Sequence, residues 1–130
     1  MLKVLYIGND REQTDDICKS LEEQGYDVCA GYSGKQGIYL FRGFLPDIIF
    51  LDLDISDMNG EDVLKQMKLE SKDSAFITVS GSKMEDHVRF NLQVLNLKER
   101  GADGFLIKPV IIEGIIRKIR EILESKKIVR

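Results

Sequence analysis

The sequence is built around short, almost wholly apolar runs that are separated by longer stretches with helical spacing. Four of these runs occupy residues 4–7, 48–51, 76–79 and 105–107. Runs this short and this apolar are typical of β-strands that are buried on both faces. A fifth run, 26–30, alternates less cleanly and is expected near the edge of the sheet. The chain is therefore expected to form five strands that need cover on both sides.

Amphipathic helices are expected between and after these strands. The clearest is 112–123, where isoleucine and leucine recur three and four residues apart while the charged residues fall on the other side. Others are expected over 12–24, from near Ser33, from near Gly60 and over 85–100. Alternating strands and helices predict an α/β fold, a doubly wound parallel sheet with helices on both faces. We expect one domain over residues 1–130 and no output domain in this chain.

Composition excludes several classes of protein. The 19 basic and 22 acidic residues give a formal net charge of -3, and no basic tract precedes the last residues, so direct binding of nucleic acid is not expected. No apolar run approaches the roughly 20 residues of a membrane span, and a signal peptide is not evident, which favours a cytoplasmic location.

Cys18 and Cys29 lack a metal-binding spacing and are expected to be small buried hydrophobes.

Mostly polar residues follow the predicted strands. In chain order they are Gly8, Asn9 and Asp10, then Asp52 and Asp54, then Ser80, then Lys108. Because the carboxyl ends of parallel strands meet at one edge, a carboxylate, a hydroxyl and an ammonium are expected to converge there. This set suits phosphoryl transfer: the carboxylate acts as nucleophile, while the other groups hold phosphoryl oxygens.

Two segments resemble the receiver domains of response regulators. Residues 46–60, PDIIFLDLDISDMNG, resemble the phosphoacceptor segment of that family, and residues 101–109, GADGFLIKP, resemble its fifth-strand signature. The resemblance implies a CheY-like, flavodoxin-like sheet of order 2-1-3-4-5. It further implies two-component signal transduction, with a phosphoryl group accepted from a histidine kinase or phosphotransfer protein.

The resemblance also assigns roles to individual residues. Asp52 matches the phosphoacceptor, Ser80 the hydroxyl that contacts the phosphoryl group, and Lys108 the ammonium that pairs with the acceptor and the phosphate. Ser80 and Phe105 match the switch positions, although a packed core phenylalanine is an alternative for Phe105. The Lys108–Pro109 peptide bond is expected to be cis. The chain would not be a classical enzyme, because its only reactions would be phosphoryl transfer to Asp52 and hydrolysis.

The expected metal site departs from the family. Two adjacent acidic residues normally follow the first strand and hold Mg²⁺, but Gly8 and Asn9 occupy those positions. Asp10 comes one residue late, and Asn9 offers a neutral oxygen, so Mg²⁺ binding through Asp52, Asp54, Asn9 and Asp10 is expected to be weak. Asp54 either helps to hold the metal or is a solvent-facing acid. Ser56 replaces the usual proline and predicts a more mobile loop.

The predicted helix 85–100 is longer than is usual for the family. In this family the fourth helix, the fifth strand and the last helix form the surface that partners read, so the resemblance implies that a downstream protein or an attached output domain binds there. A homodimer through the fourth and fifth helices is a further possibility. Leu92, Val94, Leu95 and Leu97 either supply contact area for a partner or thicken the core.

Two other functions are compatible with parts of the pattern. A degenerate receiver would keep the fold and bind a partner without phosphorylation, which the loss of the acidic pair at Gly8 and Asn9 favours. A haloacid-dehalogenase-like phosphatase would also use the Asp52-x-Asp54 pair. That family, however, places the pair on its first strand and has an acidic pair after the lysine, neither of which occurs here.

Overall fold

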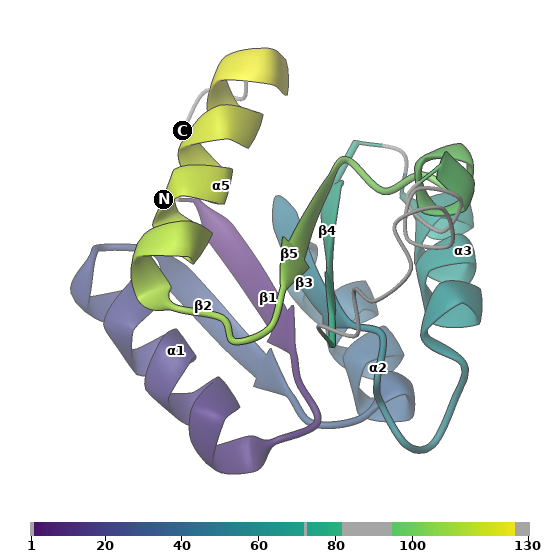
Figure 1. The fold of residues 1–130 in the computed structure, drawn as a ribbon, viewed down its shortest axis with the longest axis horizontal. Helices are drawn as coiled ribbons and strands as arrows, with labels where there is room; N and C mark the ends of the chain where they lie inside the picture. The colour runs from purple at the N-terminus through teal and green to yellow at the C-terminus, as the bar shows by residue number, and fades with distance from the viewer. Residues whose placement is uncertain (1, 72, 82–94, 127–130) are drawn as a thin grey trace.

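The computed structural model describes residues 2–71, 73–81 and 95–126. Five parallel strands form one sheet of order β2-β1-β3-β4-β5, as the resemblance implied (Figure 1). The strands are β1 (Lys3–Ile7), β2 (Asp27–Gly31), β3 (Ile48–Asp52), β4 (Ala75–Ser80) and β5 (Gly104–Ile107). Each coincides with a predicted run to within one residue at either end. The weaker run, now β2, lies at the edge, which confirms that expectation.

Helices cover both faces of the sheet. They are α1 (Arg11–Glu23), α2 (Gly34–Phe44), α3 (Gly60–Glu70) and α5 (Ile112–Lys126). Figure 1 shows α1 and α5 on one face and α2 and α3 on the other. Most of the predicted helix 85–100 lies outside the described residues, but 95–99 are helical.

Local sequence signals explain where the helices begin and end. The side chains of Asp10 and Ser33 accept hydrogen bonds from backbone N–H groups in the first turns of α1 and α2, and Asn59 does the same for α3. After α1, Gly25 adopts a φ of 96°, a left-handed conformation that glycine allows without strain. At the start of α3, a Cβ on Gly60 would lie 2.7 Å from the Leu53 backbone, so the helix begins in close contact with the loop after β3.

The core has two halves, one on each side of the sheet. Alternate residues of the central strands point to opposite faces: Val4 and Tyr6 belong to the half of the core that α1 and α5 cover, whereas Leu5 and Ile7 belong to the half that α2 and α3 cover. Leu97 is buried in the second half, while Leu95 is 57% exposed. Leu97 therefore thickens the core, whereas Leu95 faces solvent. Leu92 and Val94 lie outside the described residues.

The two cysteines have different environments. Cys18 on α1 is buried, as predicted, and burial raises the pKa of its thiol to about 12. Cys29 is only half-buried, so the prediction that it is a buried hydrophobe is wrong. The reason is that β2 is the edge strand and its side chains lack neighbours on one side. Both thiols are free.

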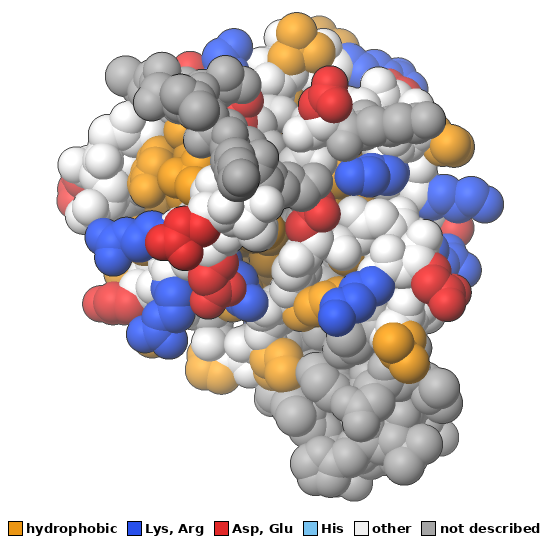
Figure 2. All heavy atoms as spheres, turned by 90° about the horizontal axis from the view of Figure 1, so that it is seen from above, with side chains coloured by type: hydrophobic (Ala, Val, Ile, Leu, Met, Phe, Trp, Pro, Cys, Tyr) orange, Lys and Arg blue, Asp and Glu red, His pale blue; other side chains and the backbone are white. Residues whose placement is uncertain are grey.

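The surface mixes both signs of charge. Figure 2 views the molecule from the edge where the strands begin, and there Lys and Arg side chains lie interspersed with Asp and Glu side chains. Over its described residues, this face presents no broad positive surface of the kind that holds a phosphate backbone. Within the described ranges, no helix is both long and apolar enough to cross a bilayer.

Candidate functional site

Asp52 is the last residue of β3, and its side chain lies at the centre of the carboxyl edge of the sheet. The residue is 5% exposed, because β1 and β4 flank β3 and leave little solvent around the carboxylate. One carboxylate oxygen, Oδ1, accepts a hydrogen bond from the Asp54 backbone N–H at 2.8 Å. The other, Oδ2, lies 2.8 Å from the Lys108 ammonium. The carboxylate is thus held at both oxygens.

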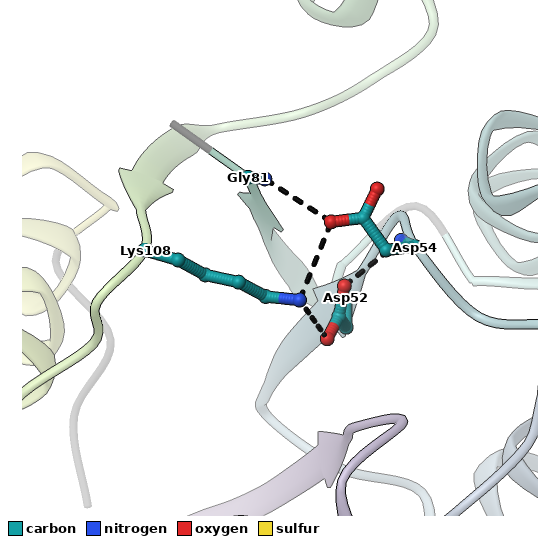
Figure 3. A network of polar contacts seen from close by, with 4 residues as sticks. All are labelled: Asp52, Asp54, Gly81 and Lys108. Carbon is teal, nitrogen blue, oxygen red and sulfur yellow. Dashed lines mark hydrogen bonds and ion pairs between the residues drawn. The ribbon is translucent and has the colours of Figure 1, made fainter. Parts of the chain in front are cut away.

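Lys108 comes directly after β5 and bridges two carboxylates. Its Nζ lies 2.8 Å from Asp52 Oδ2 and 3.3 Å from Asp54 Oδ2 (Figure 3). Burial of the ammonium lowers its pKa, but hydrogen bonds and the charges of the two carboxylates outweigh this, so the pKa of Lys108 is raised. The Lys108–Pro109 peptide bond is cis, as the resemblance implied.

Ser80 ends β4 beside these residues. Its backbone carbonyl accepts a hydrogen bond from the Lys108 backbone N–H at 2.8 Å, which fixes the end of β5 against β4. Ser80 and Asp54 also line a shallow hollow of about 340 Å³ between the end of β4 and the loop that follows β3. The structure therefore brings Asp52, Ser80 and Lys108 to one edge of the sheet, where Ser80 also lines a space open to solvent.

Phe105 lies on β5, which β4 separates from β3. It is half-buried and packs against the half of the core that contains α2 and α3. The side chain is neither fully enclosed nor freely exposed in this structure. Its position is compatible with both sequence-based interpretations, a switch residue and a core phenylalanine.

The segment after β1 differs from the carboxylate-rich edge around Asp52. A Cβ on Gly8 would lie 2.1 Å from the hydroxyl oxygen of Thr14, a residue of α1 that is 2% exposed. Asn9 is exposed. Asp10 caps α1, and its Oδ1 accepts a hydrogen bond from the Gln13 N–H at 3.1 Å. The helix N-terminus therefore already uses one oxygen of Asp10.

The donor set fits a weak Mg²⁺ site better than a strong one. Hard oxygen donors are present, because Asp52 and Asp54 each present a carboxylate, but both carboxylates contact the Lys108 ammonium. Among the described residues, no group of three or more His, Cys, Asp or Glu side chains is arranged to hold a metal ion. The positive charge that balances Asp52 in this structure is therefore that of Lys108.

Three contributors to the site and its surroundings were missed by sequence reasoning. The Gly81 N–H donates a hydrogen bond to Asp54 Oδ2 at 3.1 Å. Thr14 fills the space beside Gly8. Asp57 accepts hydrogen bonds from the Gly34 and Lys35 N–H groups at 2.8 and 3.0 Å and so caps α2 from the loop after β3. Only Asp57 had a local signal, since an aspartate in a loop is a common partner for unpaired helix N–H groups.

The loop after β3 is anchored despite the absence of a proline. Ser56 predicted a more mobile loop, whereas the neighbouring Asp57 ties the same loop to the N-terminus of α2. These hydrogen bonds lower the pKa of the Asp57 carboxyl below its ordinary value. The bond from the Lys35 N–H has the larger effect and the bond from the Gly34 N–H the smaller. The mobility of the loop remains a prediction, but one anchor of the loop is now identified.

The fold is a doubly wound α/β domain in which an aspartate and a lysine form an ion pair at the carboxyl edge of the sheet. The sequence matches the family model described as "Response regulator receiver domain" over residues 4–120. This chain belongs to the response-regulator receiver family.

Known relatives agree with this assignment. Response regulator SaeR of Staphylococcus aureus is 31% identical over 124 residues, which cover 95% of this chain and 51% of SaeR. The chain thus spans about half the length of the curated relatives it matches. A response regulator receiver domain protein of Clostridium thermocellum superposes with a TM-score of 0.83 at 25% identity, covering 98% of both chains. A CheY-like receiver domain protein of Methanospirillum hungatei gives 0.82 at 23% identity, covering 98% of this chain and 97% of the other, which supports the fold.

Proposed function

We propose that this chain is a phosphoryl-accepting receiver of a two-component system, with Asp52 as the acceptor. The observation that carries the proposal is the buried Asp52 carboxylate, 5% exposed, with the Lys108 ammonium at 2.8 Å. A buried carboxylate needs a compensating charge, and an ammonium so placed can also neutralise negative charge that develops on a phosphoryl group. The donor would be a histidine kinase or a phosphotransfer protein.

The transfer follows from the positions of these groups. An oxygen of Asp52 forms a bond to phosphorus while the bond between phosphorus and the donor's imidazole nitrogen breaks. The electron pair of the broken bond stays on that nitrogen, which leaves a neutral imidazole on the donor after protonation. Lys108 offsets the added negative charge, and the Ser80 hydroxyl is the group that would bind a phosphoryl oxygen across the hollow.

Magnesium would support this reaction weakly in this chain. Receiver domains generally bind Mg²⁺ in an acidic pocket. Here Asp52 would be the main ligand, with Asp54, Asn9 and Asp10 as further donors. Oxygens of Asp52, Asp54 and Asp10 are already engaged by N–H groups or by the Lys108 ammonium, which weakens all three as ligands. When bound, the ion would neutralise charge on the phosphoryl oxygens.

The output would be a change of surface and not a turnover of substrate. Receiver domains are not classical enzymes, and the reactions we propose are transfer to Asp52 and hydrolysis of the acyl phosphate. Movement of Ser80 toward the phosphoryl group and of Phe105 toward the core would alter the surface of the fourth helix, β5 and α5. A downstream protein, an attached output domain or a second copy of the chain would read that surface in the cytoplasm.

The alternative is a degenerate receiver that binds a partner without phosphorylation. One observation favours it: Thr14 packs against Gly8 and occupies the space from which an acidic side chain would start. The remaining groups, Asp52, Ser80 and Lys108, are those a phosphoacceptor site needs and favour the first proposal.

Intact-mass measurement separates the two functions. The purified chain is incubated with a small acyl-phosphate donor and Mg²⁺, beside Asp52→Asn and a sample that contains a chelator. One phosphoryl adduct that is absent from Asp52→Asn establishes the acceptor, and its loss with chelator establishes the metal requirement. No adduct, under conditions that label an ordinary receiver, would refute phosphoryl acceptance and favour the binding module.

A further inference from the structure

The Asp54 carboxylate contacts two hydrogen-bond donors that lie beside Asp52. Its Oδ2 accepts a hydrogen bond from the Gly81 N–H at 3.1 Å and lies 3.3 Å from Lys108 Nζ. Figure 3 shows these two donors converging on one oxygen, with Asp52 on the other side of the same ammonium. An N–H group and an ammonium that converge in this way form a small anion-binding seat.

A phosphoryl group on Asp52 would need the same donors. It carries three strong acceptor oxygens and up to two negative charges, and it would stand directly beside Lys108. Since Lys108 Nζ lies 2.8 Å from Asp52 Oδ2, a group attached to Asp52 falls within reach of this ammonium. The Asp54 carboxylate and the phosphoryl oxygens would therefore compete for the seat.

The Asp54 backbone is held beside the acceptor, whereas its side chain is largely exposed. Its backbone N–H donates to Asp52 Oδ1 at 2.8 Å, so the residue stays next to the acceptor. Its side chain is 55% exposed, and rotation would carry the carboxylate from the seat into solvent. Such an exposed ion pair is worth little, which makes it displaceable by a group of higher charge.

We propose that the Asp54 carboxylate is a built-in competing anion that occupies the seat formed by the Gly81 N–H and the Lys108 ammonium, and that an incoming phosphoryl group must displace it. This inference rests on the proposed function for its biological meaning, but not for its test. It assigns Asp54 a role on the anion side of the site, in addition to any part it plays toward a metal.

Inorganic phosphate is the probe, because its binding requires no reaction at Asp52. The Gly81 amide resonance reports occupancy of the seat in an NMR titration without metal. In Asp54→Ala we expect phosphate to bind roughly two- to tenfold more tightly than in the native chain, as expected for removal of an exposed charged competitor. The isosteric Asp54→Asn should show a gain in the same direction and guards against a folding defect in the alanine variant.

Two controls separate competition from a general change of charge. Asp57→Asn removes one negative charge from the same loop but leaves the seat unchanged, so its phosphate affinity should remain near the native value. Adding Lys108→Met to Asp54→Ala should abolish the gain, because it removes half of the seat. A gain in Asp57→Asn equal to that in Asp54→Ala, or a gain that survives loss of Lys108, would overturn the inference.

The result is independent of whether Asp52 is ever phosphorylated. Phosphate affinity that is the same in Asp54→Ala, Asp54→Asn and the native chain would refute the competing anion, even if the mass measurement shows an adduct. Tighter binding that depends on Lys108 would support it, even if no adduct forms.

Discussion

The Thr14 hydroxyl lies where a side chain on Gly8 would begin, 2.1 Å from the position of a Cβ. A carboxylate at position 8 would therefore need space that the fold does not leave there. The buried threonine of α1 has taken up the space, so the two positions have become structurally dependent on each other.

Gly8→Asp should consequently destabilise the fold. We expect a loss of about 1–3 kcal/mol, typical of inserting atoms into a packed region. Most of that loss should be recovered when Gly8→Asp is combined with Thr14→Ala, which vacates the space. Urea unfolding of the two single variants and the double variant measures this coupling. Additive effects of the two substitutions would contradict the packing argument.

Asn9→Asp should strengthen Mg²⁺ binding without a comparable cost. Asn9 is exposed and the substitution is isosteric, so a carboxylate is added without a clash just after β1, the strand that pairs with the strand of Asp52. We expect roughly a tenfold gain, because a carboxylate close to a divalent cation adds a substantial attraction even in a partly solvated site. Isothermal titration with Mg²⁺ measures the gain. Asp16→Asn, an exposed position on α1, serves as a charge-change control, and an unchanged affinity in Asn9→Asp would place the metal elsewhere.

Lys108→Met should lower stability near neutral pH by about 1–3 kcal/mol, because it leaves the buried Asp52 carboxylate without its ammonium. The pKa of Lys108 is raised in the folded state, so this contribution is fully present below the ordinary lysine pKa of 10.5. It is lost as the pH rises through the higher folded-state value. Urea unfolding at pH 7 and at steps above pH 10.5 should show the difference between native and Lys108→Met shrinking. A constant difference would argue against the ion pair.

Cys18 should make the free energy of unfolding fall with rising pH from about pH 9, which is below the range in which Lys108 acts. Burial raises its pKa from 9.0 to about 12, so above pH 9 the unfolded chain loses a proton that the folded chain retains. Stability then falls with rising pH, by at most about 1.4 kcal/mol per pH unit for one proton. Between pH 9 and 10 the slope should be reduced in Cys18→Ala. Cys29 is only half-buried, so Cys29→Ala is the matched control and should retain most of the slope of stability against pH.

Asp57→Ala should weaken the connection between the loop after β3 and α2. We expect a loss of about 0.5–1 kcal/mol, as for removal of a helix cap, together with faster hydrogen exchange at the Gly34 and Lys35 amides. The Asp57 pKa is lowered by folding, so its contribution is present above the ordinary carboxyl value of 3.8 and lost as the pH falls below it. Asp73→Ala removes an exposed aspartate elsewhere and is the control, so it should leave exchange at these two amides unchanged. Unchanged exchange at both amides would rule out the cap.

The fold and the convergence of Asp52, Ser80 and Lys108 could be predicted from sequence because each depends on local patterns. Buried parallel strands produce apolar runs, and their shared polarity brings Asp52, Ser80 and Lys108 to one edge. The contacts of Thr14 and Gly81 could not be predicted in this way. Both depend on how a helix or a loop packs in three dimensions, and neither residue type indicates such a partner on its own. Cys29 shows the same limit, since its exposure depends on the position of β2 in the sheet.

The central position of β1 has a consequence for how the chain acquires this site during synthesis. β1 pairs with β2 and with β3, whose last residue is Asp52. β1 therefore gains its second neighbour only after about 50 residues have been made, and pairing across such a sequence separation is slow compared with local helix formation. Until then one long edge of β1 lacks its β3 partner. We expect the nascent chain to be most prone to mispairing over this interval, which ends when β3, with Asp52 as its last residue, joins the sheet.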